Sequence, residues 1–218
     1  MSRFKVLIFD WDGTLADSAG MIVRAMQRAI VGLKLPPRSD QQIAELIGLG
    51  LNEALVRLYP EFDLAKLRAL LEGYRAQWLS EGAGEAELFT GALEALQILH
   101  ERGHQIAIAT GKSRRGLDRS LRHHGDVAKL VATSRCADET ASKPDPRMLR
   151  EIVEELRIDP SDALMIGDTE YDVSMARSLG MPALGVTCGV HDAARLEAAG
   201  AHDLVASVAA VPAWIRSG

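Results

Sequence analysis

Short apolar segments alternate with longer amphipathic ones along much of this chain. The short segments have four to six residues, are mostly Val, Ile, Leu, Ala or Phe, and are bounded by Gly, Pro or charged residues. This length and composition predict strands that are buried on both faces of a sheet. We expect six of them: Phe4–Phe9, Gln105–Thr110, Leu130–Thr133, Ala163–Ile166, Ala183–Val186 and Asp203–Ala206.

Amphipathic helical patterns separate most of the predicted strands. Ala92–Glu101 has leucine at every third position, which forms one apolar stripe on a helix. Arg147–Leu156 and Tyr171–Leu179 have similar stripes, and Gly180 directly after the second is a typical helix end. Strands and helices in alternation predict an α/β fold with a doubly wound parallel sheet.

The first crossover connection is much longer than a sheet requires. About ninety residues separate Asp12 from the strand at Gln105, whereas a crossover needs only about a dozen. We therefore expect an all-helical cap domain at residues 16–87, inserted into an α/β core of residues 1–15 and 88–218. An insert directly after the first strand would lie over the carboxyl end of that strand and could act as a lid on a site there. Its predicted helices are Ser18–Leu35, with Ser18 as N-cap, Gln41–Ile47, Leu51–Leu58 and Leu64–Leu79.

Two aspartates follow the first strand directly, in the sequence Asp10-Trp11-Asp12-Gly13-Thr14. Open α/β sheets place their chemistry at the carboxyl ends of strands. Two carboxylates this close repel each other unless a cation or a shared proton offsets them. Asp10 could attack phosphorus and form an aspartyl-phosphate, and Asp12 could protonate the leaving oxygen and then deprotonate the attacking water. The pattern therefore predicts a metal site beside a nucleophile.

A second acidic cluster follows another predicted strand. Asp168 comes after Gly167, and Asp172 lies one helical turn further on. We expect Asp168 to reach the same cavity from a neighbouring strand, where it and Asp10 make an oxygen-only site suited to Mg²⁺. Asp172 could be a metal ligand, a partner of a ligand, or a carboxylate favoured at a helix N-terminus by the helix dipole.

Two further segments could bind phosphate. Thr110-Gly111 ends a predicted strand, and a hydroxyl and backbone N–H near a helix N-terminus suit a phosphate oxygen. A helix cap explains Thr110 equally well. Lys143 stands before Pro144, and its ammonium could pair with phosphate and with Asp10. Taken alone, most lysines of this kind are solvated surface charges.

Composition and charge exclude several classes of protein. The net charge of −5 and the lack of a basic run argue against a nucleic-acid partner. No apolar run reaches the length of a membrane span, and two cysteines, Cys136 and Cys188, are too few for a disulfide framework. We expect a cytoplasmic protein without a membrane partner, as a monomer or a homodimer.

In their order along the chain, these motifs resemble those of the haloacid dehalogenase superfamily, in the phosphatase branch with a helical cap after the first motif. The resemblance covers essentially the whole chain. It implies Asp10 as nucleophile and Mg²⁺ ligand, Asp12 as acid–base that ligates Mg²⁺ through its backbone carbonyl, and Asp168 as a further ligand. It also implies that Thr110, Gly111 and Lys143 contact the phosphate, and that Asp172 supports the metal ligands without binding the metal itself. Many relatives carry asparagine where this chain has Gly111.

Within that superfamily, the chain looks most like phosphoglycolate phosphatases. The likeness includes the long Ser18–Leu35 segment, Ile47-Gly48-Leu49-Gly50 in the cap, and Phe89-Thr90-Gly91. It implies a small-molecule phosphate monoester as substrate, because haloacid dehalogenases and phosphonatases lack an aspartate at the position of Asp12. Three cap arginines could face an anionic substrate or be ordinary exposed residues: Arg24, Arg28 and Arg57.

Other functions remain open on the same motifs. A sugar-phosphate mutase similar to β-phosphoglucomutase uses the same core, and so does an inorganic pyrophosphatase. A phospho-receiver switch is also doubly wound, but the chain length, the helical insert and Asp12-Gly13-Thr14 argue against it. A catalytically inactive binding protein is disfavoured because every catalytic position is filled.

Overall fold

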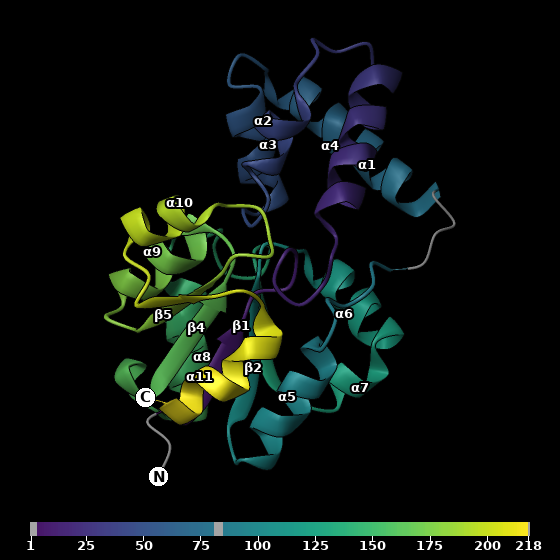
Figure 1. Ribbon diagram of the computed structural model, residues 1–218. Helices are drawn as coiled ribbons and strands as arrows, with labels where there is room; N and C mark the ends of the chain where they lie inside the picture. The colour runs from purple at the N-terminus through teal and green to yellow at the C-terminus, as the bar shows by residue number, and fades with distance from the viewer. Residues whose placement is uncertain (1–3, 81–84, 218) are drawn as a thin grey trace.

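A parallel sheet of six strands lies at the centre of the computed structural model, which describes residues 4–80 and 85–217 (Figure 1). Its spatial order is β3 (Val131–Cys136), β2 (Gln105–Thr110), β1 (Val6–Phe9), β4 (Ala163–Gly167), β5 (Ala183–Val186) and β6 (Asp203–Val205). Phe9, the last residue of β1, pairs in register with Ile108 of β2 and Ile166 of β4. The strand order reverses between β1 and β4, and open sheets bind ligands at such a switch point.

Helices cover both faces of the sheet, because successive strand residues point to opposite faces. Leu7 and Phe9 belong to the apolar core that includes α5 (Ala92–Glu101), α6 (Arg114–His123), α7 (Gly125–Ala128) and α11 (Val211–Ser217). Val6 and Ile8 belong to the core on the other face, with α8 (Arg147–Leu156), α9 (Glu170–Ser178) and α10 (Ala193–Ala199). The predicted doubly wound parallel sheet is confirmed.

Four helices between β1 and α5 form a separate layer at the top of Figure 1, beyond the carboxyl end of the sheet. They have an apolar core of their own, which includes Met26, Ile30, Leu55 and Tyr59. Their bounds are α1 (Ala19–Gly32), α2 (Asp40–Ala44), α3 (Leu51–Leu58) and α4 (Leu64–Ser80). No described helix is both long and apolar enough to cross a membrane.

The two segments that join the helical layer to the sheet run side by side. The Asp17 amide donates to the Glu87 carbonyl at 2.9 Å, and the Phe89 amide donates to the Leu15 carbonyl at 2.9 Å. The chain therefore leaves the sheet and returns to it at neighbouring places. Two further hydrogen bonds join the layers elsewhere, from the Gly50 amide to the Ser142 hydroxyl at 2.8 Å and from the Tyr171 hydroxyl to the Glu45 carbonyl at 2.9 Å. The predicted spans 1–15, 16–87 and 88–218 also contain residues 1–3, 81–84 and 218, which lie outside the described residues.

Several elements differ from the sequence expectations. The helices α6, α7 and α10 were not predicted because apolar side chains are sparse in them. Each has one fully buried apolar side chain, Leu117, Val127 and Leu196 respectively, and α6 adds only the partly buried Leu121. Strand β3 extends to Cys136 rather than ending at Thr133. Its added residues are partly polar because β3 lies at the edge of the sheet, where polar side chains are tolerated.

Candidate functional site

Three buried carboxylates gather at the carboxyl edge of the sheet. Asp10 follows β1 and Asp168 follows β4, so the pairing of these two strands brings them together. Asp172 comes from the first turn of α9. Each of the three offers an oxygen that lies within 4.8 Å of those of the other two. The predicted meeting of Asp10 with Asp168 is thus present, and Asp172 joins it.

Lys143 lies between two of these carboxylates. Its ammonium is 2.7 Å from Asp10 Oδ1 and 2.7 Å from Asp172 Oδ1, and all three side chains are buried. Burial by itself lowers the pKa of Lys143, but the attraction of Asp10 and Asp172 outweighs it and raises the pKa. Lys143 therefore stays charged, and it is not the solvated surface lysine that its sequence context alone favours.

Asp168 is fixed by two donors. The Thr14 hydroxyl donates to its Oδ1 at 2.8 Å, and the Val190 amide donates to its Oδ2 at 2.8 Å. Gly13, with φ of +85°, passes so close to this carboxylate that a Cβ there would collide with it. Burial, together with the charge of Asp172, raises the pKa of Asp168 to about 7.

The site fits a divalent cation. Burial and the neighbouring carboxylates raise the pKa of Asp10 well above its usual value, against the opposing effect of Lys143. Asp10 Oδ2 is buried and has no hydrogen-bond donor in the described part of the chain. Three buried carboxylates face one ammonium, so a further positive charge is needed to keep them all ionised. Carboxylate oxygens of this kind suit Mg²⁺.

Asp172 already has partners for both of its oxygens. Oδ2 accepts hydrogen bonds from the Thr169 amide at 3.2 Å and the Thr169 hydroxyl at 2.6 Å, and Oδ1 contacts Lys143. The Thr169 hydroxyl in turn accepts from the Asp172 amide, which completes a capping box at the start of α9. Asp172 is therefore both a helix-terminal carboxylate and the anchor of Lys143.

Asp12 has two partners that the sequence analysis missed. Lys112 Nζ lies 2.9 and 3.2 Å from the two carboxylate oxygens of Asp12, and the Ser18 hydroxyl donates to Oδ1 at 2.7 Å. Ser18 does stand at the N-cap position of α1, but its side chain makes no capping hydrogen bond because it is turned toward Asp12. The position of Lys112 directly after Thr110-Gly111 was a signal that could have identified it.

Thr110 is the last residue of the neighbouring strand β2, and Gly111 follows it directly. Thr110 is buried, and its hydroxyl accepts a hydrogen bond from the Lys112 amide at 3.2 Å. A Cβ at Gly111 would lie 2.5 Å from the Leu49 carbonyl oxygen and 2.6 Å from that of Gly48. Glycine at this position therefore lets the helical layer approach the sheet.

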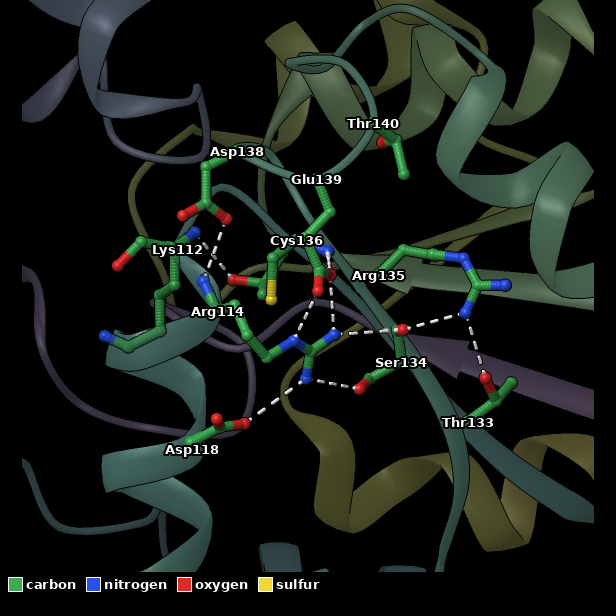
Figure 2. Close-up of polar contacts among 12 residues, drawn as sticks. Lys112, Arg114, Asp118, Thr133, Ser134, Arg135, Cys136, Asp138, Glu139 and Thr140 are labelled. Carbon is green, nitrogen blue, oxygen red and sulfur yellow. Dashed lines mark hydrogen bonds and ion pairs between the residues drawn. The ribbon is translucent and has the colours of Figure 1, made fainter.

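A cluster around Arg114 holds the loop that leads to Lys143 (Figure 2). The Arg114 guanidinium binds both oxygens of Glu139, at 2.8 and 2.7 Å, and its backbone amide donates to Asp138 at 2.9 Å. The guanidinium also donates to the Ser134 hydroxyl at 3.0 Å. Arg114 therefore connects α6, β3 and the loop that follows β3. Figure 2 shows the Lys112 ammonium pointing away from this cluster.

A cavity of about 720 Å³ lies between the sheet and the helical layer. Asp10 and Asp12 line it on the sheet side, and residues of all four helices or their connections line the other side. The arginines at positions 24, 28 and 57, considered above for an anionic substrate, lie outside its lining. Arg57 is instead paired with Glu53 at 2.8 Å.

Comparisons with known proteins agree with this geometry. Residues 7–186 match the family model described as haloacid dehalogenase-like hydrolase. A protein of Dickeya dadantii named "Probable phosphatase IndB" is 34% identical over 89% of this chain and 86% of its own length. A phosphoglycolate phosphatase of Agrobacterium fabrum is 29% identical, over 87% and 83%. A predicted phosphatase of known structure from Clostridium acetobutylicum superposes with a TM-score of 0.87 at 26% identity, over 100% of both chains.

Proposed function

Because this chain belongs to the haloacid dehalogenase-like hydrolase family, we propose that it is a phosphatase that hydrolyses a small-molecule phosphate monoester through an aspartyl-phosphate at Asp10. One observation supports this proposal above the others. Asp10 presents a buried carboxylate oxygen without a hydrogen-bond donor in the described residues, beside Lys143, and Asp12 lines the same cavity.

In the first step, the Asp10 carboxylate attacks phosphorus, and the bond from phosphorus to the alcohol oxygen breaks. Asp12, in its protonated form, gives its proton to the departing alkoxide. In the second step, Asp12 takes a proton from water as that water attacks phosphorus, and the bond between phosphorus and Asp10 breaks. Inorganic phosphate and free Asp10 result. Ser18 and Lys112 orient the Asp12 carboxylate for both proton transfers.

The remaining residues hold the phosphoryl group and its charge. We assign Lys143, the Thr110 hydroxyl and the backbone N–H of Gly111 to phosphate oxygens. Asp10, Asp168 and the backbone carbonyl of Asp12 would hold Mg²⁺, which supplies positive charge to the phosphoryl oxygens. Asp172 keeps Lys143 in place rather than binding the metal, since both of its oxygens are already engaged.

We further propose that residues 16–87 act as a cap domain over a core of residues 1–15 and 88–218. The paired connections at Asp17 and Phe89 are the points about which such a cap could open. Closure excludes water while Asp10 is phosphorylated. A cytoplasmic location, a lack of nucleic-acid and membrane partners, and a monomeric or homodimeric state stay predictions from the sequence.

The test is phosphate release from a panel of esters that includes 2-phosphoglycolate, β-glucose 1-phosphate and pyrophosphate. The names of the relatives make 2-phosphoglycolate the reference ester. We expect release that depends on Mg²⁺ and stops with chelator. Release that continues in chelator would contradict the metal site, and conversion of the sugar phosphate to its isomer without net phosphate release would favour a mutase.

A further inference from the structure

The cavity indicates which kind of alcohol the substrate ester carries. We propose that this alcohol bears an apolar ring, which packs against Tyr74 and Trp78 of α4 when the phosphoryl group is at Asp10. This inference rests on the proposed phosphatase function and specifies its substrate class. Tyr74 and Trp78 are called the aromatic pair below.

The aromatic pair faces the acid–base residue. Tyr74 and Trp78 are one helical turn apart on α4, and their rings stack with centroids 6.1 Å apart. Both line the cavity. Lys112 Nζ lies 5.4 Å from the centroid of the Trp78 ring and 2.9 Å from Asp12 Oδ1. The same ammonium group therefore contacts both Trp78 and Asp12. A leaving group that receives its proton from Asp12 is therefore within reach of the aromatic pair.

The rest of the wall on this side is largely apolar. Members of α1, α3 and α4 and their neighbours supply branched or sulfur-containing side chains: Ile22, Met26, Ile43, Leu55, Leu58 and Leu71. The hydroxyl of Tyr74 has no hydrogen-bond partner in the part of the chain that the structure describes. It is thus free to contact one polar atom of an otherwise apolar ligand. Apolar walls with few polar groups are typical of sites for ring-bearing ligands.

The charges in the lining argue against an anionic alcohol such as glycolate. Lys112 is engaged by Asp12, Arg75 by Glu72 at 3.0 Å, and Arg119 by Glu85 at 2.6 Å. The remaining basic residue of the described lining, Arg115, is exposed. A carboxylate on the substrate, in addition to its phosphoryl group, would have to break one of these pairs or stay at the exposed side.

The size of the cavity agrees with this assignment. Its volume of about 720 Å³ lies within the range of about 300–1,000 Å³ typical of sites for drug-sized ligands. A phosphoryl group with a two-carbon alcohol would leave most of this space to water. A ring displaces that water from apolar walls, which is the favourable term in its binding.

Two esters test the inference separately from the phosphatase proposal. Benzyl phosphate and ethyl phosphate are both esters of primary alcohols, and they differ mainly in the ring. We expect kcat/KM with Mg²⁺ to be at least about tenfold higher for benzyl phosphate, as burial of a ring allows. Equal hydrolysis of the two esters, or a preference for ethyl phosphate or 2-phosphoglycolate, would overturn the ring assignment and leave the phosphatase standing.

A variant locates the ring contact. In Trp78→Ala, the ratio of kcat/KM for benzyl to ethyl phosphate should fall to within about twofold of unity, because the wall that binds the ring is lost. Leu64→Ala on the same helix is the matched control, since Leu64 is 76% exposed and lies outside the lining. An unchanged ratio in Trp78→Ala would contradict the placement of the ring.

If neither ester is hydrolysed, the phosphatase proposal is overturned. The ring preference can still be tested by a binding measurement that needs no turnover. Calorimetry with the non-hydrolysable probes benzylphosphonate and ethylphosphonate, in the presence of Mg²⁺, measures the ring preference of the wild-type protein without turnover. About tenfold tighter binding of benzylphosphonate supports the inference. Equal binding of the two probes, or no binding of either, overturns it.

Discussion

Magnesium should stabilise this protein more at high pH than at low pH, because the carboxylate cluster is buried. Burial raises the pKa of Asp168 from 3.8 to about 7. In the unfolded chain, the same carboxyl ionises near its ordinary pKa, so the unfolded state loses this proton first as the pH rises. The metal-free folded state therefore loses stability between about pH 4 and pH 7.

The size of this loss follows from the two pKa values. The difference between 3.8 and about 7 corresponds to about 4 kcal/mol of unfolding free energy once both states are ionised. A protein of this length changes its Tm by about 2–4 °C per kcal/mol, so Asp168 alone accounts for roughly 10 °C. A divalent cation favours the ionised carboxylates, so saturating Mg²⁺ should offset the loss at about pH 8 and have little effect at about pH 5.

The assay is thermal unfolding across this pH range, with Mg²⁺ or with chelator, on the wild-type protein and on Asp168→Asn. The variant cannot ionise at this position, so the increase in Tm that Mg²⁺ causes should be smaller and depend less on pH. A Tm increase of equal size at both ends of the pH range in the wild-type protein would refute the reasoning. So would a variant that keeps the full pH dependence.

Three further predictions follow from individual residues. Asp10→Asn should abolish phosphate release and leave the far-ultraviolet circular dichroism unchanged, because the amide cannot attack phosphorus; full activity in a folded variant would disprove the role of the nucleophile. Lys143→Met should lower the unfolding free energy by about 3–5 kcal/mol in urea titrations, because two buried carboxylates lose their counter-charge, and a loss below about 1 kcal/mol would contradict the ion pairs. Gly111→Ala should lower kcat/KM at least about tenfold, since its Cβ would lie 2.5 Å from the Leu49 carbonyl oxygen and push the helical layer away. Gly32→Ala is its control, because a Cβ there meets no atom within 4 Å, and equal kinetics in the two variants would contradict the close approach.

The sheet and its acidic edge were predictable because their signals are local. The strands at β1 and β4 are short, apolar and followed directly by aspartate, and parallel pairing places the ends of neighbouring strands together. Asp10, Asp168 and Asp172 therefore meet as the spacing suggests, although the sequence left the role of Asp172 open. The role of Lys143 was harder to predict, because only its burial beside Asp10 in the folded protein distinguishes it from a surface lysine.

The residues that the sequence did not identify depend on how the helical layer sits on the sheet. Ser18 looks like a helix cap in the sequence, and only the fold turns its hydroxyl toward Asp12. Tyr74 and Trp78 lie on α4, many residues away from any catalytic motif. No periodicity or spacing reveals that their rings face the cavity, since that depends on the angle between the two layers.

The most direct test of the proposed mechanism is to detect the phosphoryl group on Asp10. The protein would be mixed with Mg²⁺ and an ester that it hydrolyses, and the reaction would be quenched in acid within the first turnovers. Peptides from a digest of the protein would then be analysed by mass spectrometry, with Asp10→Asn as control. The mechanism predicts a phosphorylated peptide that carries the group on Asp10 and is missing from the variant. Rapid ester hydrolysis without that adduct, together with undiminished turnover by Asp10→Asn, would contradict it.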